Sequence, residues 1–419
     1  MAEYWTGALG SVHPLLYLGV LILSGYAGGR LAHAVSLPRI TGYIVAGMLL
    51  SPSLLGVFKA DILDRQLSLV TDIALGVIAF SIGGALEFSK LRKLGRAIIV
   101  ITFVQAFLVA LVVSLSVIFL VPHLPGAGLM RGNTLVSVGL LLGAICAATA
   151  PAAILGIVHE YKARGPMTTV LLGVITLDDG ITLVLFSMAT GIAGSLGGKE
   201  ASLLHSGIVE PGREVLVALL VGAAAGWLLR LLIPVVKRGG AVLGLTLGTI
   251  FVTSGVALTL RTSSLLACMM LGLVLVNTMN RPEVWFEAVE KVEEPLFAMF
   301  FVVAGAHLDL SALAAAGTLA LLVVTMRTIA KLGGSYLGCV LSGAPAVVKK
   351  YLPLGLLPQA GVSIGLVLAA TEYVRDAHAA GIMVNAILAS VIVNELVSPL
   401  LVKTALFKAG EAQSMEDEI

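Results

Sequence analysis

The chain has 419 residues, of which 58% are hydrophobic and 12% are charged, and its formal net charge is +2. Soluble domains carry roughly 25% charged residues, and a mean hydropathy of +1.04 exceeds what one aqueous core can bury. This composition excludes an ordinary soluble domain and gives no reason to expect nucleic-acid binding. Three cysteines without metal-ligand spacing exclude a disulfide framework.

The hydropathy pattern predicts an all-α polytopic membrane protein, because apolar segments long enough to cross a bilayer recur along the chain. Thirteen spans are expected, at 14–34, 37–56, 67–86, 97–120, 134–158, 167–194, 214–234, 241–260, 263–279, 295–308, 312–341, 352–371 and 381–403. Residues 1–403 then form one membrane unit, and residues 404–419 form a short cytoplasmic tail. The segment before His13 contains no Lys or Arg, so it does not resemble a cleavable signal peptide.

Basic residues predict the orientation of the chain in the membrane. If the N-terminus is outside, 17 Lys and Arg residues fall in the inner loops and tail and 7 in the outer loops. Because cytoplasmic loops are enriched in Lys and Arg, we expect the N-terminus outside and the C-terminus in the cytoplasm of an inner (plasma) membrane.

The spans divide into a first set of six at about 14–194, a linking helix at about 214–234, and a second set of six at about 241–403. The fifth span carries Thr149-Ala150-Pro151, and the twelfth carries Pro358-Gln359-Ala360-Gly361. A proline among small residues at mid-membrane interrupts a helix. Paired interruptions at corresponding places in two inverted repeats indicate the central site of a transporter.

Two adjacent carboxylates, Asp178 and Asp179, lie near the middle of the sixth span. A charged group at the bilayer centre costs about 2.5–3.5 kcal/mol on insertion scales, so it is usually functional. Neighbours on a helix point about 100° apart, so one carboxylate can face a cavity while the other faces another helix.

Two cations lie one helical turn apart in the eleventh span, at Arg327 and Lys331, and are natural partners for the aspartates. Arg keeps its charge when buried, whereas a buried Lys can lose its proton. We therefore expect Lys331 to take part in proton exchange and Arg327 to be a permanent charge. Either residue could pair with Asp178.

Together these residues predict a site that holds either a proton or a small hard cation such as sodium. Asp179 would bind the cation with Thr149, freed backbone carbonyls and water, since hard cations prefer oxygen ligands. Asp178 would pair with Lys331, and arrival of the cation would break that pair and release a proton. Weaker candidates are Asp72 in the third span, and Asn394 and Glu395 in the last.

Several stretches carry a resemblance to a known family: Pro38–Ile44, Cys146–Ala153, Leu177–Gly180, PLFAMFFVVAG at 295–305 and LPQAGVSIG at 357–365. They resemble bacterial monovalent cation:proton antiporters of the NapA-like and Kef-type group, from the second span to the last. The resemblance implies thirteen helices in inverted repeats, with two discontinuous helices that cross at the ion site. It also implies interleaved dimerisation and mobile core subdomains, an elevator-like movement, and a homodimer.

Carried over residue by residue, the resemblance makes Asp179 the main cation and proton carboxylate, Asp178 the paired aspartate, and Lys331 its basic partner. It implies no cofactor beyond the transported ions. Unlike the Kef-type proteins, this chain shows no soluble nucleotide-binding regulatory domain.

Three alternatives stay open. A potassium/proton antiporter uses the same oxygen ligands. An intramembrane aspartyl protease needs two carboxylates that converge from different helices, whereas Asp178 and Asp179 diverge. An ion channel needs a continuous pore, often with a repeated filter, and no filter-like repeat is found.

Overall fold

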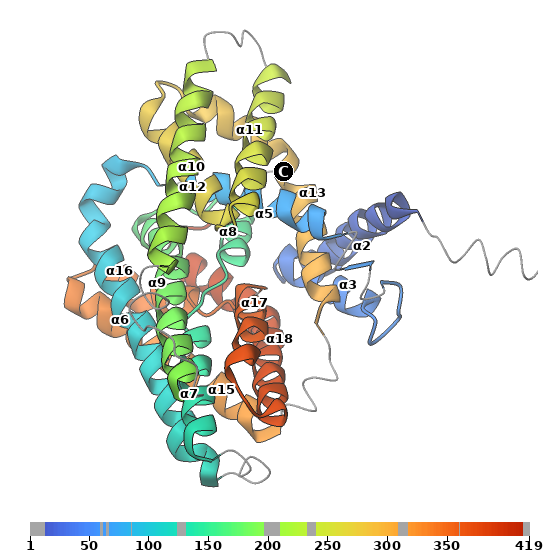
Figure 1. Ribbon diagram of the computed structural model, residues 1–419. Coiled ribbons are helices and arrows are strands. Elements are labelled where there is room, and N and C mark those ends of the chain that lie inside the picture. The colour runs from blue at the N-terminus through green and yellow to red at the C-terminus, as the bar shows by residue number, and fades with distance from the viewer. Residues whose placement is uncertain are drawn as a thin grey trace, which may run out of the picture.

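A computed structural model describes residues 13–58, 62–63, 67–84, 86–123, 131–196, 210–232, 240–308, 317–359 and 361–413. The regular structure in these residues is helical (Figure 1). The first half contains α2 (Pro14–Ala34), α3 (Arg39–Leu50), α5 (Ser68–Gly84), α6 (Phe88–Leu120), α7 (Gly132–Cys146), α8 (Pro151–Glu160) and α9 (Pro166–Leu196). The linking helix is α10 (Glu210–Leu232). The second half contains α11 (Gly240–Thr259), α12 (Ser264–Thr278), α13 (Glu283–Ala306), α15 (Gly317–Ser342), α16 (Ala346–Gly355), α17 (Gly361–Ala370) and α18 (Ala377–Lys408).

Among the described residues, eight helical segments are long and apolar enough to cross a membrane, and α3, α5, α12 and the segment Val362–Tyr373 are shorter apolar helices. Each of the thirteen predicted spans overlaps a helix or a pair of half-helices, and the helix that overlaps the tenth span, α13, is not among these twelve apolar segments. The predicted polytopic all-α fold is therefore confirmed.

Several predicted boundaries were wrong. Helix α13 begins at Glu283 rather than at residue 295, so Pro295 lies inside the helix. Its first turns carry several acidic residues, which lower the hydropathy without interrupting the helix. Helix α6 begins at Phe88 rather than at residue 97. The predicted start of the eleventh span, residues 312–316, lies outside the described residues, and α15 is described from Gly317.

The C-terminal boundary also differs from the expected one. Helix α18 continues to Lys408 instead of ending at residue 403. Beyond it, the buried Glu411 accepts hydrogen bonds from the backbone amides of Met167 and Thr168 at 2.8 and 2.7 Å. A carboxylate at this position caps the N-terminus of α9 and complements its dipole. Residues 404–413 thus pack on the helical bundle, and the acidic run 415–419 lies outside the described residues.

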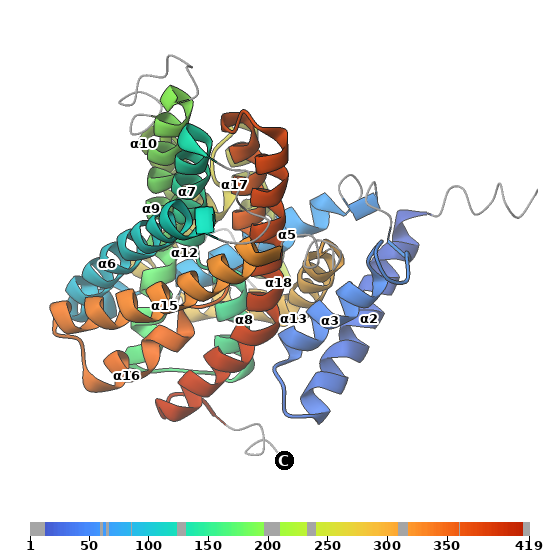
Figure 2. The same cartoon turned by 90° about the horizontal axis from the view of Figure 1, so that it is seen from below.

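The helices form two groups that contact each other less than they contact their own members. One group contains α2, α3, α5, α10, α11, α12 and α13. The other, here called the broken-helix group, contains α6, α7, α8, α9, α15, α16, α17 and α18. Figures 1 and 2 show α2 and α3 on one side of the molecule and α6 and α16 on the other, with α18 between them.

The pairing of helices between the two halves is reciprocal, as expected for two related repeats. Helix α5 is the third helix of the first set and packs along α12, the second helix of the second set. Conversely, the second helix of the first set, α3, packs along the third helix of the second set, α13. The fourth helices, α6 and α15, also pack together. Helices α3 and α13 approach closely through glycine, since a Cβ on Gly47 would strike the backbone of Val302 and one on Gly305 would strike Ile44.

Candidate functional site

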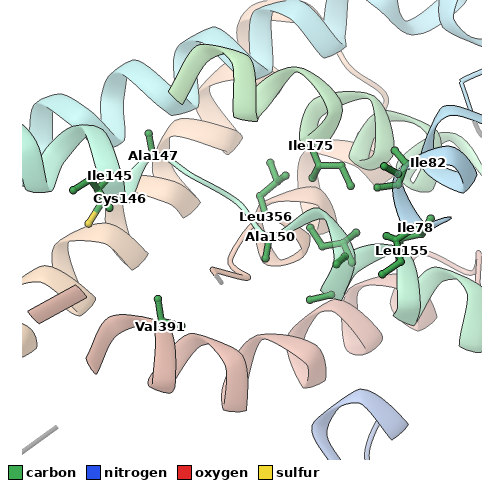
Figure 3. Packing of buried hydrophobic residues seen from close by; sticks show 14 of the residues in the cluster. Ile78, Ile82, Ile145, Cys146, Ala147, Ala150, Leu155, Ile175, Leu356 and Val391 are labelled. Carbon is green, nitrogen blue, oxygen red and sulfur yellow. The ribbon is translucent and has the colours of Figure 1, made fainter. Parts of the chain in front are cut away.

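The first helix interruption separates α7 from α8 and follows directly from Pro151. The residue before a proline avoids the helical region, and Ala150 is extended, with φ −84° and ψ 104°. Pro151 occupies the first turn of α8, where its missing N–H would have no partner inside the helix in any case. Figure 3 shows Cys146 at the end of α7, and Ala147 and Ala150 in the non-helical segment between the half-helices.

The second interruption separates α16, which ends at Gly355, from α17, which begins at Gly361. The two interruptions touch, because the amide of Ala150 donates a hydrogen bond of 3.0 Å to the carbonyl of Pro358. The predicted discontinuities at 150–151 and 358–361 therefore form one junction in the structure, with Ala360 outside the described residues.

Arg327, fully buried on α15, binds carbonyls from both interruptions. Its guanidinium donates to Cys146 (3.1 Å) and Ala148 (2.9 Å) on one side of the junction. It donates to Leu357 (2.8 Å) and more distantly to Pro358 (3.4 Å) on the other. The C-terminal ends of α7 and α16 leave carbonyls without partners in their helices, and a cation complements both helix dipoles. Arg327 is thus a structural cross-link between the half-helices.

Lys331, one turn along α15, is also fully buried. Its Nζ donates a hydrogen bond to the carbonyl of Ala147 and lies 3.4 Å from Oδ2 of Asp178. No ion pair joins Arg327 to Asp178 among the described residues, so the basic partner of Asp178 in this structure is Lys331.

Asp178 has three side-chain partners, which come from α6, from the segment between α7 and α8, and from α15. Its Oδ1 accepts a hydrogen bond from Gln105 on α6, and its Oδ2 accepts one from Thr149 as well as facing Lys331. Thr149, expected as a ligand of the cation, is thus bonded to Asp178 here. Sequence reasoning missed Gln105, although it is an amide in the middle of an otherwise apolar span and could have been noticed for that reason.

Asp179 differs from its neighbour because it borders a cavity. It is 7% exposed, and its Oδ1 has no hydrogen-bond partner among the described residues. The cavity has a volume of about 680 Å³ and extends from exposed Glu214 and His307 to Asp179. Thr149 and Ser363, from the two interrupted segments, also line it. A hydrated ion could therefore reach the Asp179 carboxylate from one end of the bundle.

The weaker candidates separate in the structure. Asn394 contacts Arg327 through Oδ1 (3.3 Å) and approaches Gln359 through Nδ2 (3.4 Å), so it belongs to the junction. Glu395 lines the cavity with Asp179. Asp72 is only partly buried on α5 and is not among the residues that line this cavity.

At the end of the bundle away from the cavity, polar contacts join the two helix groups. His159 at the end of α8 lies 2.7 Å from Glu293 of α13, and Glu293 also accepts a hydrogen bond from Ser81 of α5. Both carboxylate oxygens of Glu160 accept a hydrogen bond from the backbone amide of Arg39, at 3.0 Å each. The Arg39 side chain forms an ion pair with Glu294. We call these residues the far-end cluster.

The fold is that of a known ion transporter. The structure of the sodium proton antiporter MjNhaP1 from Methanocaldococcus jannaschii matches 94% of this chain and 98% of its own, with a TM-score of 0.69 and 20% sequence identity. Comparison with curated protein sequences yields no match. This likeness and the apolar helices define the class of the fold, which is that of a polytopic membrane protein.

The family follows from the sequence itself. Residues 19–408 match the family model described as sodium/hydrogen exchanger, transmembrane. The chain therefore belongs to the sodium/hydrogen exchanger family and is a monovalent cation:proton antiporter.

Proposed function

We propose that this protein exchanges sodium, or lithium, for protons, and that Asp179 binds the two ions alternately. The observation that carries the proposal is the contrast between the adjacent aspartates. Asp178 is held by Gln105, Thr149 and Lys331, whereas Asp179 faces a cavity with an oxygen that has no partner among the described residues. A carboxylate left free at the wall of a cavity can bind a cation or a proton, but not both.

The Asp178–Lys331 pair gives a route for coupling. A sodium ion at Asp179 places a second positive charge close to Lys331 and competes for the negative charge of Asp178. Lys331 would then lose its proton, since a buried ammonium without its counter-ion is unfavourable. With one proton from Asp179 and one from Lys331, two protons would exchange for each sodium ion.

Alternating access is supported by the two different ends of the bundle. The cavity reaches Asp179 from the end that contains Glu214 and His307. At the opposite end, the far-end cluster joins the two helix groups through the contacts of His159 with Glu293 and of Glu160 with the amide of Arg39. An elevator-like movement of the broken-helix group would require these contacts to break. Because the excess of basic residues predicts the N-terminus outside, the cavity would face outward in this conformation.

Residues 14–194 and 241–403 would be inverted repeats, and the group of α2, α3, α5 and α10–α13 would be the fixed, dimerising part of a homodimer in the inner membrane. The reciprocal packing of α5 with α12 and of α3 with α13 supports the repeat.

The test is ion-driven proton flux in proteoliposomes containing wild type or Asp179→Asn. Sodium and lithium gradients should each drive proton movement in wild type, and Asp179→Asn should fold but not exchange. A preference for potassium would favour the rival potassium/proton assignment. Retained exchange in folded Asp179→Asn would contradict the role of this carboxylate, and unitary currents in a planar bilayer would indicate a channel.

A further inference from the structure

A second buried acid borders the cavity, and the site described above does not account for it. Glu395 lies on α18, is 3% exposed, and lines the same cavity as Asp179. Neither of its carboxylate oxygens has a hydrogen-bond partner among the described residues. Its neighbour Asn394 makes the contacts to Arg327 and Gln359, so α18 already has another residue that holds the junction together.

The absence of partners distinguishes Glu395 from three other buried acids, which are held by hydrogen bonds or ion pairs. Asp178 is held by three side chains, Glu293 by Ser81 and His159, and Glu411 by amides at the start of α9. A carboxyl group that holds helices together needs such bonds, because an unpartnered buried polar group destabilises the fold. Glu395 makes no hydrogen bond with the described residues that would stabilise the fold, yet it lines the cavity through which an ion would reach Asp179.

The wall of the cavity explains what Glu395 could bind. It carries two buried carboxyl groups, one from α9 and one from α18, together with hydroxyl oxygens of Thr149 and Ser363. The groups are oxygen ligands, which suit hard cations. No lysine or arginine is among the residues that line the cavity, and its other titratable groups are Glu214 and His307 at the exposed end. A cation that enters therefore meets the two buried acids without a lysine or arginine beside them.

We propose that Glu395 is a second carboxyl of the transport path. It releases its proton to the cavity as it takes up a sodium ion, then passes the ion to Asp179 and takes up the proton that Asp179 gives up, so that two protons still exchange for each sodium ion. This inference rests on the proposed sodium/proton exchange. In this scheme Asp179 is the essential site, while Glu395 raises the occupancy of the cavity by sodium and adds a titrating group to sodium uptake.

The test compares initial exchange rates in proteoliposomes across sodium concentrations and pH. The variants are E395Q, which removes the titrating group, and E395D, which keeps it on a shorter side chain. E287Q is the control, since Glu287 is an exposed acid on α13 away from the cavity. Thermal unfolding in detergent confirms that each variant is folded.

For E395Q we expect the apparent KM for sodium to rise about tenfold at alkaline pH, with maximal turnover within about twofold of wild type. Its KM should depend less steeply on pH than that of wild type. E395D should keep the steeper pH dependence, and E287Q should match wild type. A merely structural residue would lower stability or turnover without changing how KM depends on pH.

An unchanged KM–pH profile in folded E395Q would overturn the role of Glu395 while leaving wild-type exchange intact. If E395Q does not fold, E395D decides, because its shorter side chain withdraws the carboxyl group from the sodium ion. A raised KM for sodium with the wild-type pH dependence supports the proposal, and a wild-type KM overturns it. Absence of exchange in wild type itself would refute the proposed function, and with it this inference.

Discussion

Lys331 and Asp178 form an ion pair across α15 and α9, with Nζ 3.4 Å from Oδ2 and both side chains fully buried. Removing one member leaves the other as an uncompensated buried charge, which typically destabilises a protein by about 3–5 kcal/mol. We therefore expect Lys331→Met to lower the thermal unfolding temperature strongly, and Lys331→Met with Asp178→Asn to recover much of the loss. Lys408→Met, at an exposed position, is the control. A double variant no more stable than the single one would show that the pair is not coupled.

A second prediction concerns Arg327, whose hydrogen-bond partners are mainly backbone carbonyls rather than a carboxylate. Hydrogen bonds from charged groups contribute about 1.5–3 kcal/mol each, and Lys cannot reproduce the planar fork of a guanidinium. Arg327→Lys should lose at least two of the bonds and reduce stability by about 3 kcal/mol or more. Chemical unfolding in detergent measures this change. Wild-type stability in Arg327→Lys would mean that the half-helices do not need this cross-link.

The parts of the site that sequence reasoning found are those with local signals. Pro151 and Pro358 interrupt apolar segments. Four charged residues lie inside predicted membrane spans: Asp178, Asp179, Arg327 and Lys331. Each stands out without knowledge of the fold. The choice between Arg327 and Lys331 as the partner of Asp178 needed the structure, because both share one helix face.

Contacts between distant segments were not predictable in the same way. The hydrogen bond from Gln105 to Asp178 and the capping of α9 by Glu411 depend on how helices far apart in sequence meet. The start of α13 was misplaced because hydropathy detects the membrane-embedded portion of a helix, not its charged extension.

Exchange of two protons for one sodium ion carries net charge, so its rate should depend on membrane potential. One elementary charge moved through 100 mV corresponds to about 2.3 kcal/mol. Proteoliposomes with a potassium diffusion potential should show faster sodium extrusion when the potential favours net inward charge. Rates that do not respond to the potential would rule out this stoichiometry.

The far-end cluster gives a prediction about dynamics. Glu293→Gln removes the charge that pairs with His159 at 2.7 Å and should loosen the end of α8. Backbone amides near residue 159 should then exchange hydrogen for deuterium about tenfold faster, since fewer contacts oppose local opening. Glu287→Gln, on the exposed face of α13, should leave exchange unchanged. Equal protection in Glu293→Gln and wild type would contradict a role for this contact in closing the bundle.

The most direct test of the central claim is sodium binding by the purified protein in detergent as a function of pH. If sodium and a proton compete for Asp179, the apparent affinity for sodium should fall as pH decreases, and Asp179→Asn should bind sodium at least tenfold more weakly than wild type, with only Glu395 left as a buried acid at the cavity. Affinity that is independent of pH, or normal binding by folded Asp179→Asn, would contradict the account.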